Sequence, residues 1–391
     1  MTTDRFDVVL AGGGPVGMAL ALRLHARAIP TLLLEAQGVP EQLKDPRPLA
    51  LSYGSRLILQ RLGVWARLSQ ITPINKIHIS NRGYFGRTVL TSQEAGVPEL
   101  GYVVNYHDLH HSMHQLLQSS RGANYQLGAM VSKLTTTPDE ATVEYQQHGE
   151  SKCAAAKLLV LADGGQLAAQ IPNIRYHAHE YQQWAVVANV ETTIPQSGIA
   201  YERFTTDGPV ALLPSGTGYA LVWTVPAQSV KEILALNDQA FLSALQCHFG
   251  DRPGKFIHTG KRSGFPLSLK YAVPATAMRT ALIGNASQTL HPVAGQGFNL
   301  GLRDAWELSS EISTLSATPS KIGSQGMLHS YEQKRQIDRN AGKFFTDSLA
   351  KIFTIDFPVF QTFCGIGLSV LDCLPPAKRF VARRMIFGAR G

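Results

Sequence analysis

The alternation of apolar and polar positions predicts a strand–helix–strand unit at the start of the chain. An apolar run over residues 6–11 stops at three glycines, a periodic segment follows over 16–27, and a second apolar run over 31–34 ends at Glu35. Short apolar runs bounded by glycine are typical of buried strands, and an apolar residue every third or fourth position is typical of a helix. The pattern therefore predicts strand, tight turn, helix and strand within about thirty residues.

Later segments continue this mixture of helix and strand. Residues 49–69 show a helical period, residues 101–118 predict a short strand that runs into a helix, and residues 154–162 predict a buried strand that ends at Asp163. The core face expected for the first of these helices carries Leu57, Leu59, Leu62 and Trp65.

A β-rich stretch interrupts this alternation. Residues 184–266 contain the runs AVVANV, PVALLP and YALVWTV, with a helical pattern only over 231–249. After residue 280 the chain returns to strand, loop and helix, and from residue 327 it is mostly helical. We therefore expect an antiparallel sheet, inserted into a discontinuous nucleotide-binding domain, that carries a substrate surface.

Composition narrows the possible classes of protein. The chain is 44% hydrophobic and 16% charged, which is not the composition of a disordered protein. Its net charge of +8 is spread widely and concentrates only after Lys378, so we expect no nucleic-acid binding. Its four cysteines form no CxxC pair, so we expect buried, reduced thiols and no metal site. We also expect neither a signal peptide nor a membrane-spanning helix.

The first glycine cluster has the order Gly12-x-Gly14-x-x-Gly17, directly after a predicted strand and before a predicted helix. In this context the first glycine permits a tight turn, the second lets the backbone approach a pyrophosphate, and the third lets helix and strand pack closely. Glu35, eighteen residues after Gly17, stands where a carboxylate can accept a ribose hydroxyl. The motif predicts FAD or NAD rather than NADP, and does not decide between the first two.

A second glycine-rich loop, HPVAGQGFNLGLRD from His291 to Asp304, follows the apolar run ALIGNA. Gly295 and Gly297 would let backbone N–H groups approach a flat ring, with a helix dipole behind them that favours negative charge. The alternative is an ordinary helix N-cap loop whose small residues serve packing.

These segments resemble the ubiquinone-biosynthesis hydroxylases, within the FAD-dependent aromatic hydroxylases of para-hydroxybenzoate hydroxylase type. The resemblance covers essentially the whole chain and is carried by AGGGPVGMALALRL, DPRPLALS, GYVVNYHDL, LVLADGG, YERFTTDGPVALLP, GKRSGFPL and HPVAGQGFNLGLRD. Within this family the chain is most similar to the 2-polyprenyl-6-methoxyphenol hydroxylase branch.

The resemblance implies an α/β (α+β) fold: a Rossmann-like FAD-binding domain, an inserted antiparallel β-sheet substrate domain and a C-terminal helical segment. We assign residues 1–72, 101–175 and 274–335 to the first, 73–100 and 176–273 to the second, and 336–391 to the third. The implied FAD-binding residues are Gly12, Gly14, Gly17, Glu35, Arg47, Asp163, Gly164, Asn285, Gly295, Gln296, Gly297 and Asn299, and Pro292 would also line the flavin ring.

The sequence departs from the family pattern at two places. Asn285 stands where the family usually has Asp, although an amide can still hydrogen-bond a ribityl hydroxyl. Leu167 and Gln170 stand where Ser and Arg are usual, which puts in doubt how this segment meets a nicotinamide cofactor. The electron donor, NAD(P)H directly or a reductase partner, stays open.

The implied reaction is hydroxylation of the aromatic ring of a polyprenyl phenol by O2 through a flavin hydroperoxide, with NAD(P)H as transient electron donor. Two alternatives stay open: a flavin-dependent reductase or oxidase of another lipid, and a non-catalytic scaffold subunit of the ubiquinone biosynthetic complex. His291 and Pro292 are the candidate catalytic residues, and a loop-fixing histidine is the alternative reading for His291.

Two other features call for an interpretation. The pairs His107/His111 and His110/His114 have the i, i+4 spacing of metal ligands, but no acidic or cysteine partner is near, so we expect a solvated helix face. The C-terminal segment from Phe363 mixes apolar and basic residues, which fits either a peripheral membrane or complex association or a helix packed on its own domain. We expect a cytoplasmic protein that associates peripherally with the inner membrane.

Overall fold

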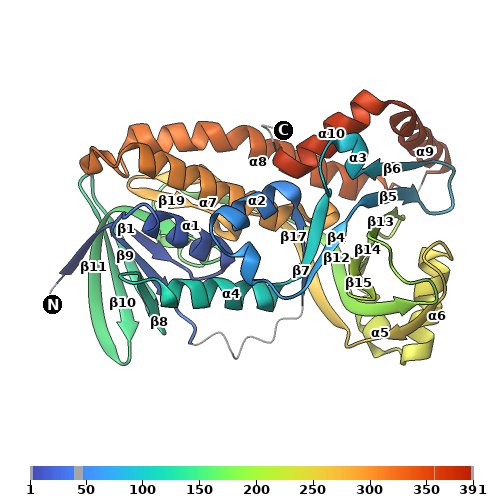
Figure 1. Ribbon diagram of the computed structural model, residues 1–391, viewed down its shortest axis with the longest axis horizontal. Coiled ribbons are helices and arrows are strands. Elements are labelled where there is room, and N and C mark those ends of the chain that lie inside the picture. The colour runs from blue at the N-terminus through green and yellow to red at the C-terminus, as the bar shows by residue number, and fades with distance from the viewer. Residues whose placement is uncertain (1–2, 39–46, 356, 389–391) are drawn as a thin grey trace.

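The structure, a computed structural model, describes residues 3–38, 47–355 and 357–388. An eight-stranded sheet forms one end of the molecule (Figure 1). Its parallel strands lie in the order β8–β2–β1–β11–β19, and an antiparallel extension, β9 and β10, leaves from β11. The strands are β1 (Thr3–Ala11), β2 (Thr31–Glu35), β8 (Asn124–Leu127), β9 (Met130–Thr136), β10 (Ala141–Gln147), β11 (Glu150–Leu161), β18 (Thr276–Ala277) and β19 (Thr280–Leu282).

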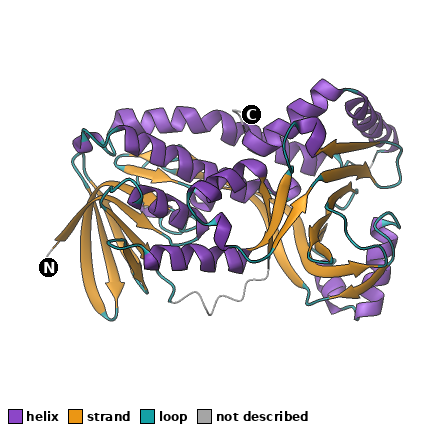
Figure 2. Cartoon of the chain, viewed as in Figure 1, coloured by secondary structure: helices purple, strands orange, loops and turns teal. Residues whose placement is uncertain are grey.

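Helices cover this sheet, and the first of them confirms the predicted strand–helix–strand unit. Helix α1 begins directly after Gly14 and packs between α4 and α7. Helix α7 packs in turn against α8, which runs along one long side of the molecule (Figure 2). The helices are α1 (Pro15–His25), α2 (Tyr53–Arg61), α4 (Tyr106–Ser119), α7 (Gln296–Thr314) and α8 (Gln325–Ile352).

A nine-stranded sheet forms the other end of the molecule. It is antiparallel, as expected, except where β13 pairs with β5 in parallel. Helices α5 (Val230–Ala235) and α6 (Asp238–Phe249) pack on it, which confirms the helical pattern predicted there. The strands are β5 (Lys76–Asn81), β6 (Arg87–Thr91), β12 (Arg175–Thr192), β13 (Ile199–Phe204), β14 (Val210–Ser215), β15 (Gly218–Pro226), β16 (Phe256–Thr259), β17 (Ser263–Val273) and β20 (Gln288–Thr289).

A three-stranded sheet, in the order β3–β7–β4, lies between the two larger ones (Figure 1). It consists of β3 (Pro48–Ser52), β7 (Gly101–Asn105) and β4 (Ile71–Ile74). The helix expected over residues 49–69 was therefore wrong at its start. Pairing with β7 holds residues 48–52 extended, and the helix begins only at Tyr53, where the Ser52 hydroxyl accepts the N–H of Ser55 at 3.2 Å.

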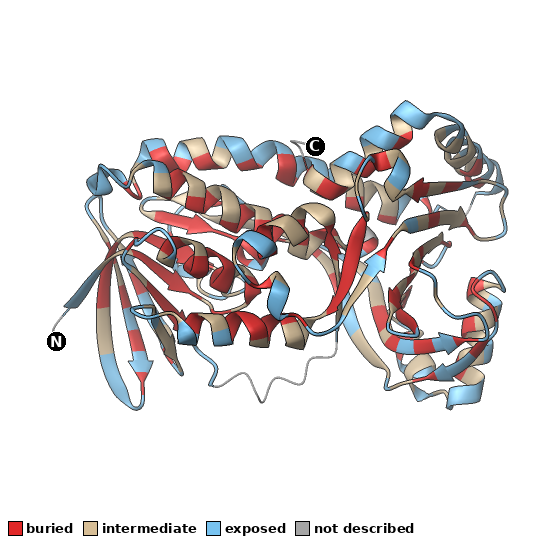
Figure 3. Ribbon diagram, in the orientation of Figure 1, coloured by how far each residue is buried: buried red, intermediate tan, exposed pale blue. Residues whose placement is uncertain are grey.

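The chain ends in two helices, α9 (Pro358–Cys373) and α10 (Pro375–Phe387). Helix α9 packs on β5 and β6, and α10 packs on α2 and on the short helix α3 (Ser92–Ala95). Both helices carry exposed residues on their outer side, whereas the central strands of the first sheet are buried (Figure 3). Among the described residues no single helix is long and apolar enough to span a membrane. The pair α9 and α10 reaches that length together, but it is bent by 98°.

The division into three domains remains our proposal, because β20 lies in the assigned FAD-binding segment yet pairs with β17 of the substrate sheet. Asp45 and Pro46 of the DPRPLALS motif lie outside the described residues. The expectation that all four cysteines are buried was wrong for Cys247 and Cys373, which are exposed.

Candidate functional site

The phosphate loop has the close contacts that its glycines predict. A Cβ on Gly12, where φ is +110°, would lie 2.6 Å from the backbone of Ala162, and one on Gly17 would lie 2.1 Å from the oxygen of Gly12. A Cβ on Gly14 would meet nothing within 4 Å. The space in front of the α1 N-terminus is therefore open, and the unpaired N–H groups of the first turn fit a pyrophosphate.

Glu35, at the end of β2, lies beside this loop. One carboxylate oxygen accepts the N–H of Gly13 at 2.5 Å and the other accepts the N–H of Gln37 at 2.7 Å. Each oxygen keeps a further lone pair, so the carboxylate can still accept a hydrogen bond from a ribose hydroxyl. The bonds to the loop also hold Glu35 in place before any ligand binds.

Asp163 and Gly164 follow β11 on the same edge of the sheet. The Asp163 carboxylate accepts the N–H groups of Gly165 at 3.0 Å and Leu167 at 2.6 Å, and thus shapes the turn. Gln170 serves the fold: its side-chain oxygen accepts the N–H of Leu134 at 2.9 Å. Leu167 packs against the core beneath the sheet. Leu167 and Gln170, which replace the usual Ser and Arg, therefore both make contacts within the protein itself.

The second glycine loop leads into α7. Gly295 has φ +60°, and a Cβ there would lie 2.9 Å from the Cβ of Ala50 on β3. Asn299, one turn into the helix, fixes this junction. Its amide oxygen accepts Ser52 N–H at 2.8 Å and Ser55 hydroxyl at 2.6 Å, while its NH2 group donates to Ala50 and Gly295 carbonyls at 2.9 and 2.7 Å. The Asn299 side chain thus positions the loop, and the open face of the loop is left to backbone groups.

His291 is buried at the start of this loop. Its Nδ1 accepts the N–H of Val293 at 3.3 Å, and its ring meets the ring of Tyr181 edge to face at 5.1 Å. Burial lowers the pKa of His291 to about 4, so the ring is neutral at physiological pH. Pro292 is exposed beside it and lines the cavity described below. This geometry supports the loop-fixing reading of His291 over the catalytic one.

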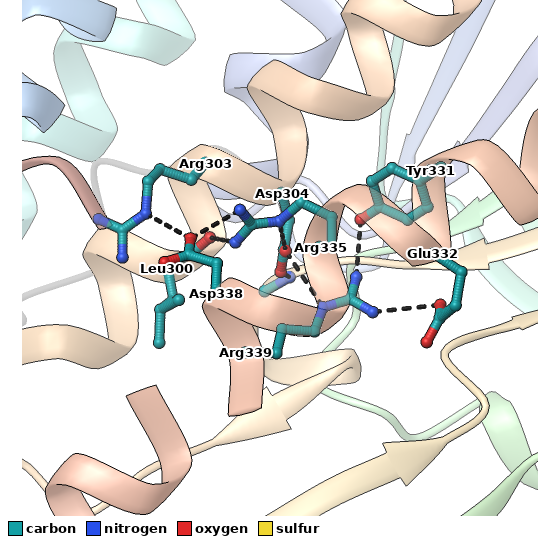
Figure 4. Close-up of polar contacts among 9 residues, drawn as sticks. Leu300, Arg303, Asp304, Tyr331, Glu332, Arg335, Asp338 and Arg339 are labelled. Carbon is teal, nitrogen blue, oxygen red and sulfur yellow. Dashed lines mark hydrogen bonds and ion pairs between the residues drawn. The ribbon is translucent and has the colours of Figure 1, made fainter. Parts of the chain in front are cut away.

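A buried ionic network ties the loop to the helices behind it (Figure 4). Asp304 of α7 accepts Nε of Arg335 at 2.7 Å and Nε of Arg339 at 3.3 Å, and its other oxygen accepts Gly284 N–H at 3.2 Å. Asp338 of α8 bridges Arg303 and Arg335 at 2.8 and 2.6 Å. Although burial opposes it, these two guanidinium groups hold the pKa of Asp338 below its usual value. The network fixes the segment that carries Asn285.

An apolar cavity of about 460 Å³ joins the second loop to the substrate sheet and the C-terminal helices. The predicted residues Asn285, Pro292, Gln296 and Gly297 are part of its lining. Helices α9 and α10 add apolar side chains to the lining: Leu368, Leu371, Val381, Ala382 and Met385. Such a space suits a ligand that combines an aromatic ring with a hydrocarbon tail.

Two further predicted residues, Arg47 and Asn285, are exposed, and only Asn285 lines the cavity. The Arg47 guanidinium is exposed and lies 5.4 Å from the ring centres of Tyr106 and Phe265. Asn285, in the short turn after β19, is exposed to the cavity. Glu202 lines the cavity from β13, although the sequence pattern predicts no role for it. The one sign of it in the sequence is a lone acidic residue within the strand segment YERF.

The histidines of α4 do not form the solvated face that we expected. His110 and His114 are buried, at 6% and 3% exposure, because they face the nucleotide sheet side of the helix with Leu109 and Met113. His107 and His111 lie next to them on the helix, are only partly buried, and stack on each other at 6.0 Å. No cluster of three or more His, Cys, Asp or Glu residues suited to a metal occurs in the described part of the chain.

Comparison with known proteins gives consistent results. The FAD-binding-domain family matches residues 5–340. An uncharacterized protein of Synechocystis is 30% identical over 98% of this chain and 94% of its own length. The ubiquinone hydroxylase UbiL of Rhodospirillum rubrum is 29% identical over 96% of this chain and 88% of its own length. The 3-demethoxyubiquinol 3-hydroxylase of Escherichia coli is 26% identical over 97% and 98%, respectively.

Solved structures share the fold. The p-nitrophenol 4-monooxygenase PnpA of Pseudomonas putida matches with a TM-score of 0.80 and 15% identity over 100% of both chains. The flavin-dependent brominase Bmp2 matches with a TM-score of 0.76 and 15% identity over 98% of this chain and 94% of its own. Together with the parallel sheet, the antiparallel sheet and the C-terminal helices, these likenesses confirm the predicted fold class.

Proposed function

The chain belongs to the FAD-dependent aromatic monooxygenase family, and we propose that it hydroxylates the ring of a polyprenyl phenol in ubiquinone biosynthesis. The cavity carries this proposal. It is lined both by the loop that would face the flavin and by apolar side chains of two C-terminal helices, so one ligand can place a ring against the first and an isoprenoid tail against the second. The relatives named ubiquinone hydroxylase and 3-demethoxyubiquinol 3-hydroxylase support the same substrate class.

The residues around the cavity suggest how the chain would hold the cofactor. Gly12, Gly14 and Gly17 would hold the ADP half, with Glu35 on the ribose, and Arg47, Asp163 and Gly164 would lie along the pyrophosphate and ribityl region. Asn285 would meet the ribityl chain, and Pro292 and the backbone from Gly295 to Gly297 would meet the isoalloxazine ring. Asn299, whose bonding groups are all engaged inside the protein, would act by holding that backbone.

Bound FAD supplies the redox chemistry, using electrons from NAD(P)H to place one oxygen atom of O2 on the ring. The chain's own task is to bind and orient the phenol and to exclude water. Aliphatic side chains from β5, β14, α9 and α10 enclose the tail, which removes bulk water from the reacting end. The α7 N-terminus directs its unpaired N–H groups toward the same end, where they favour negative charge.

We further propose that helix α9 rests on a membrane surface. Its outer side exposes Phe363 (65%), Ile366 (46%) and Val370 (50%), and Phe380 of α10 continues the patch at 60%. Arg379 and Arg383 stand beside Phe380 around a shallow groove suited to an anionic head group. Lys378 does not contribute, because it is buried in ion pairs with Glu94 and Asp372.

The deciding experiment supplies the purified, FAD-loaded protein with NAD(P)H, isotopically labelled O2 and a methoxyphenol that carries a short isoprenyl tail. One labelled oxygen atom in the product ring supports hydroxylation. A product without label supports an oxidase if it is more oxidised than the phenol, and a reductase if it is more reduced. A protein that binds no flavin and forms no product supports the scaffold alternative.

A further inference from the structure

A single acidic side chain stands in the wall of the apolar cavity. Among the described residues that line it, Glu202 is the only one of a charged type, and Tyr201 is the only other one that titrates. An isolated carboxyl group in apolar surroundings costs stability unless it is paired or used. The position of Glu202 in this wall therefore suggests a role in function.

The strand register fixes where this side chain points. Glu202 lies opposite Ile79 of β5 and Ala211 of β14, and Ala211 lies opposite Val222 of β15. All four line the cavity, so they form one row across the same face of the sheet. Ala200 and Phe204, two residues to either side on β13, line it too, as the alternation of a strand requires.

No protein group satisfies the carboxyl. Glu202 makes no hydrogen bond or ion pair with the residues that the structure describes. The cavity-lining side chains of β5, β14, α8, α9 and α10 are apolar. The other polar side chains in the lining are uncharged, and none of them bonds Glu202: Ser52, Asn285, Thr289, Gln296 and Asn299. His78 and Arg203 belong to the opposite face of the sheet, where His78 meets Tyr201 and Arg203 meets Phe249. Burial raises the pKa of Glu202 to about 7.

We propose that Glu202 is the general base of the hydroxylation, accepting the phenolic proton of the bound substrate; this rests on the proposed function. A carboxyl group poised near neutrality in an apolar cavity is suited to this role. It occupies the cavity that also contains Asn285 and Gly297, so one phenol can meet both the base and the flavin-facing loop.

The phenolic O–H bond breaks, its proton bonds to the Glu202 carboxylate, and its electron pair moves through the ring to the carbon that forms the new C–O bond. The oxygen atom comes from O2, whose other atom leaves as water with two electrons from NAD(P)H. The ring carbon then loses its hydrogen as a proton, and Glu202 returns its own proton to the phenolic oxygen. The released proton, one hydrogen of NAD(P)H and one proton from the solvent supply the hydrogens of the new hydroxyl group and of the water.

The test compares FAD-loaded wild-type, E202Q and E202D proteins on the methoxyphenol with a short isoprenyl tail, from pH 5.5 to 8.5. Wild-type kcat should rise through about pH 7. E202Q should lower kcat about 10²-fold at pH 8 and flatten the profile, with KM changed less than about threefold, since the apolar walls remain. E202D should recover part of the rate. E191Q, on an exposed position of β12 in the same sheet, should match the wild type.

A second measurement does not depend on turnover. Because the folded pKa of about 7 lies above the usual 4.5, the carboxyl group destabilises the folded state increasingly from pH 4.5 to about 7, and by a constant amount above that. E202Q should therefore unfold at a higher temperature than the wild type at pH 8, and at nearly the same temperature at pH 4.5.

The outcomes separate the two ideas. Unchanged kcat and pH profile in E202Q, or a change in KM alone, would overturn the role of Glu202 while labelled product from the wild type leaves the hydroxylase function standing. A wild-type protein that forms no labelled product overturns the proposed function, and the general base with it.

Discussion

Asp304 and Arg335 join the two longest helices of the nucleotide domain through a contact of 2.7 Å that is almost fully buried on both sides. The other oxygen of Asp304 accepts the N–H of Gly284, so one carboxylate holds α7, α8 and the turn before Asn285 together. Removing its charge leaves two buried guanidinium groups with one carboxylate partner fewer each: Arg335 keeps Asp338 and Arg339 keeps Glu332.

We therefore expect D304N to lower the free energy of unfolding by about 3–5 kcal/mol, the typical cost of breaking a buried ion pair. Urea unfolding followed by circular dichroism measures this. D139N, on an exposed turn, is the control and should stay within about 0.5 kcal/mol of the wild type. A loss below about 1 kcal/mol in D304N would show that the network is not needed for stability.

The phosphate loop allows the fold and the cofactor to be separated. G14A places its Cβ in open space, so the FAD-free protein should keep its stability within about 0.5 kcal/mol. Its affinity for FAD should fall at least about tenfold, because the methyl group occupies the place expected for the pyrophosphate. Fluorescence titration with FAD measures the affinity. G38A, also in open space, should bind like the wild type. Unweakened binding by G14A would mean that the pyrophosphate lies elsewhere.

His291 gives a pH-dependent stability. Its pKa in the folded protein is about 4, below the ordinary 6.5. Between these two pH values the unfolded chain binds a proton at this histidine and the folded protein does not. Stability from this residue is present above pH 6.5 and falls as pH drops toward 4, by about 3 kcal/mol at most. On acidification the melting temperature of H291N should fall less steeply than that of the wild type. H258N, which changes an exposed histidine, should behave like the wild type. A loss of the alkaline or neutral limb of the kcat profile in H291N would instead restore His291 as a catalytic group.

Gln170 tests the departure from the usual Arg. If this residue serves only the fold, Q170A should cost about 1–3 kcal/mol by leaving the Leu134 N–H without its acceptor. The KM for NADPH and for NADH should change less than about twofold. A selective rise in either KM would place the nicotinamide cofactor at this turn.

The membrane face of α9 can be tested with point variants, which leave the cavity wall intact. The protein should bind vesicles that contain phosphatidylglycerol, and the double variant F363S/V370S should bind at least about tenfold more weakly, since two large apolar side chains leave the lipid. I257S removes an apolar residue that is 57% exposed on β16 and serves as the control. Equal binding by all three proteins would exclude α9 as the contact.

Much of the fold could be predicted because its signals are local. The strand, glycine turn and helix up to His25 follow from periodicity, and so do the strand and helix from Gly101. Strand β3 could not be read in this way, since residues 48–52 become extended by pairing with β7, some fifty residues away. The burial of His110 likewise depends on which side of α4 meets α1, and the helix pattern alone does not say.

The candidate site also contains residues that the sequence predicts and residues that it does not. Gly12, Gly14 and Gly17 could be found because their roles follow from spacing. The role of Asn299 could not, since its four partners come from β3, α2 and the preceding loop. Glu202 was missed because its isolation depends on helices α9 and α10, which close the cavity from 150 residues farther along the chain.

Helix α9 is apolar on both sides: its inner residues line the cavity, and its outer residues Phe363, Ile366 and Val370 face away from the protein. For a lipid substrate, moving the tail from bilayer to cavity is then a transfer between two hydrocarbon media, with little gain in free energy. Occupancy would depend on the polar ring and on the concentration of the phenol within the membrane. The enzyme would thus sample its substrate by exchange and could release the product as easily as it took the phenol in.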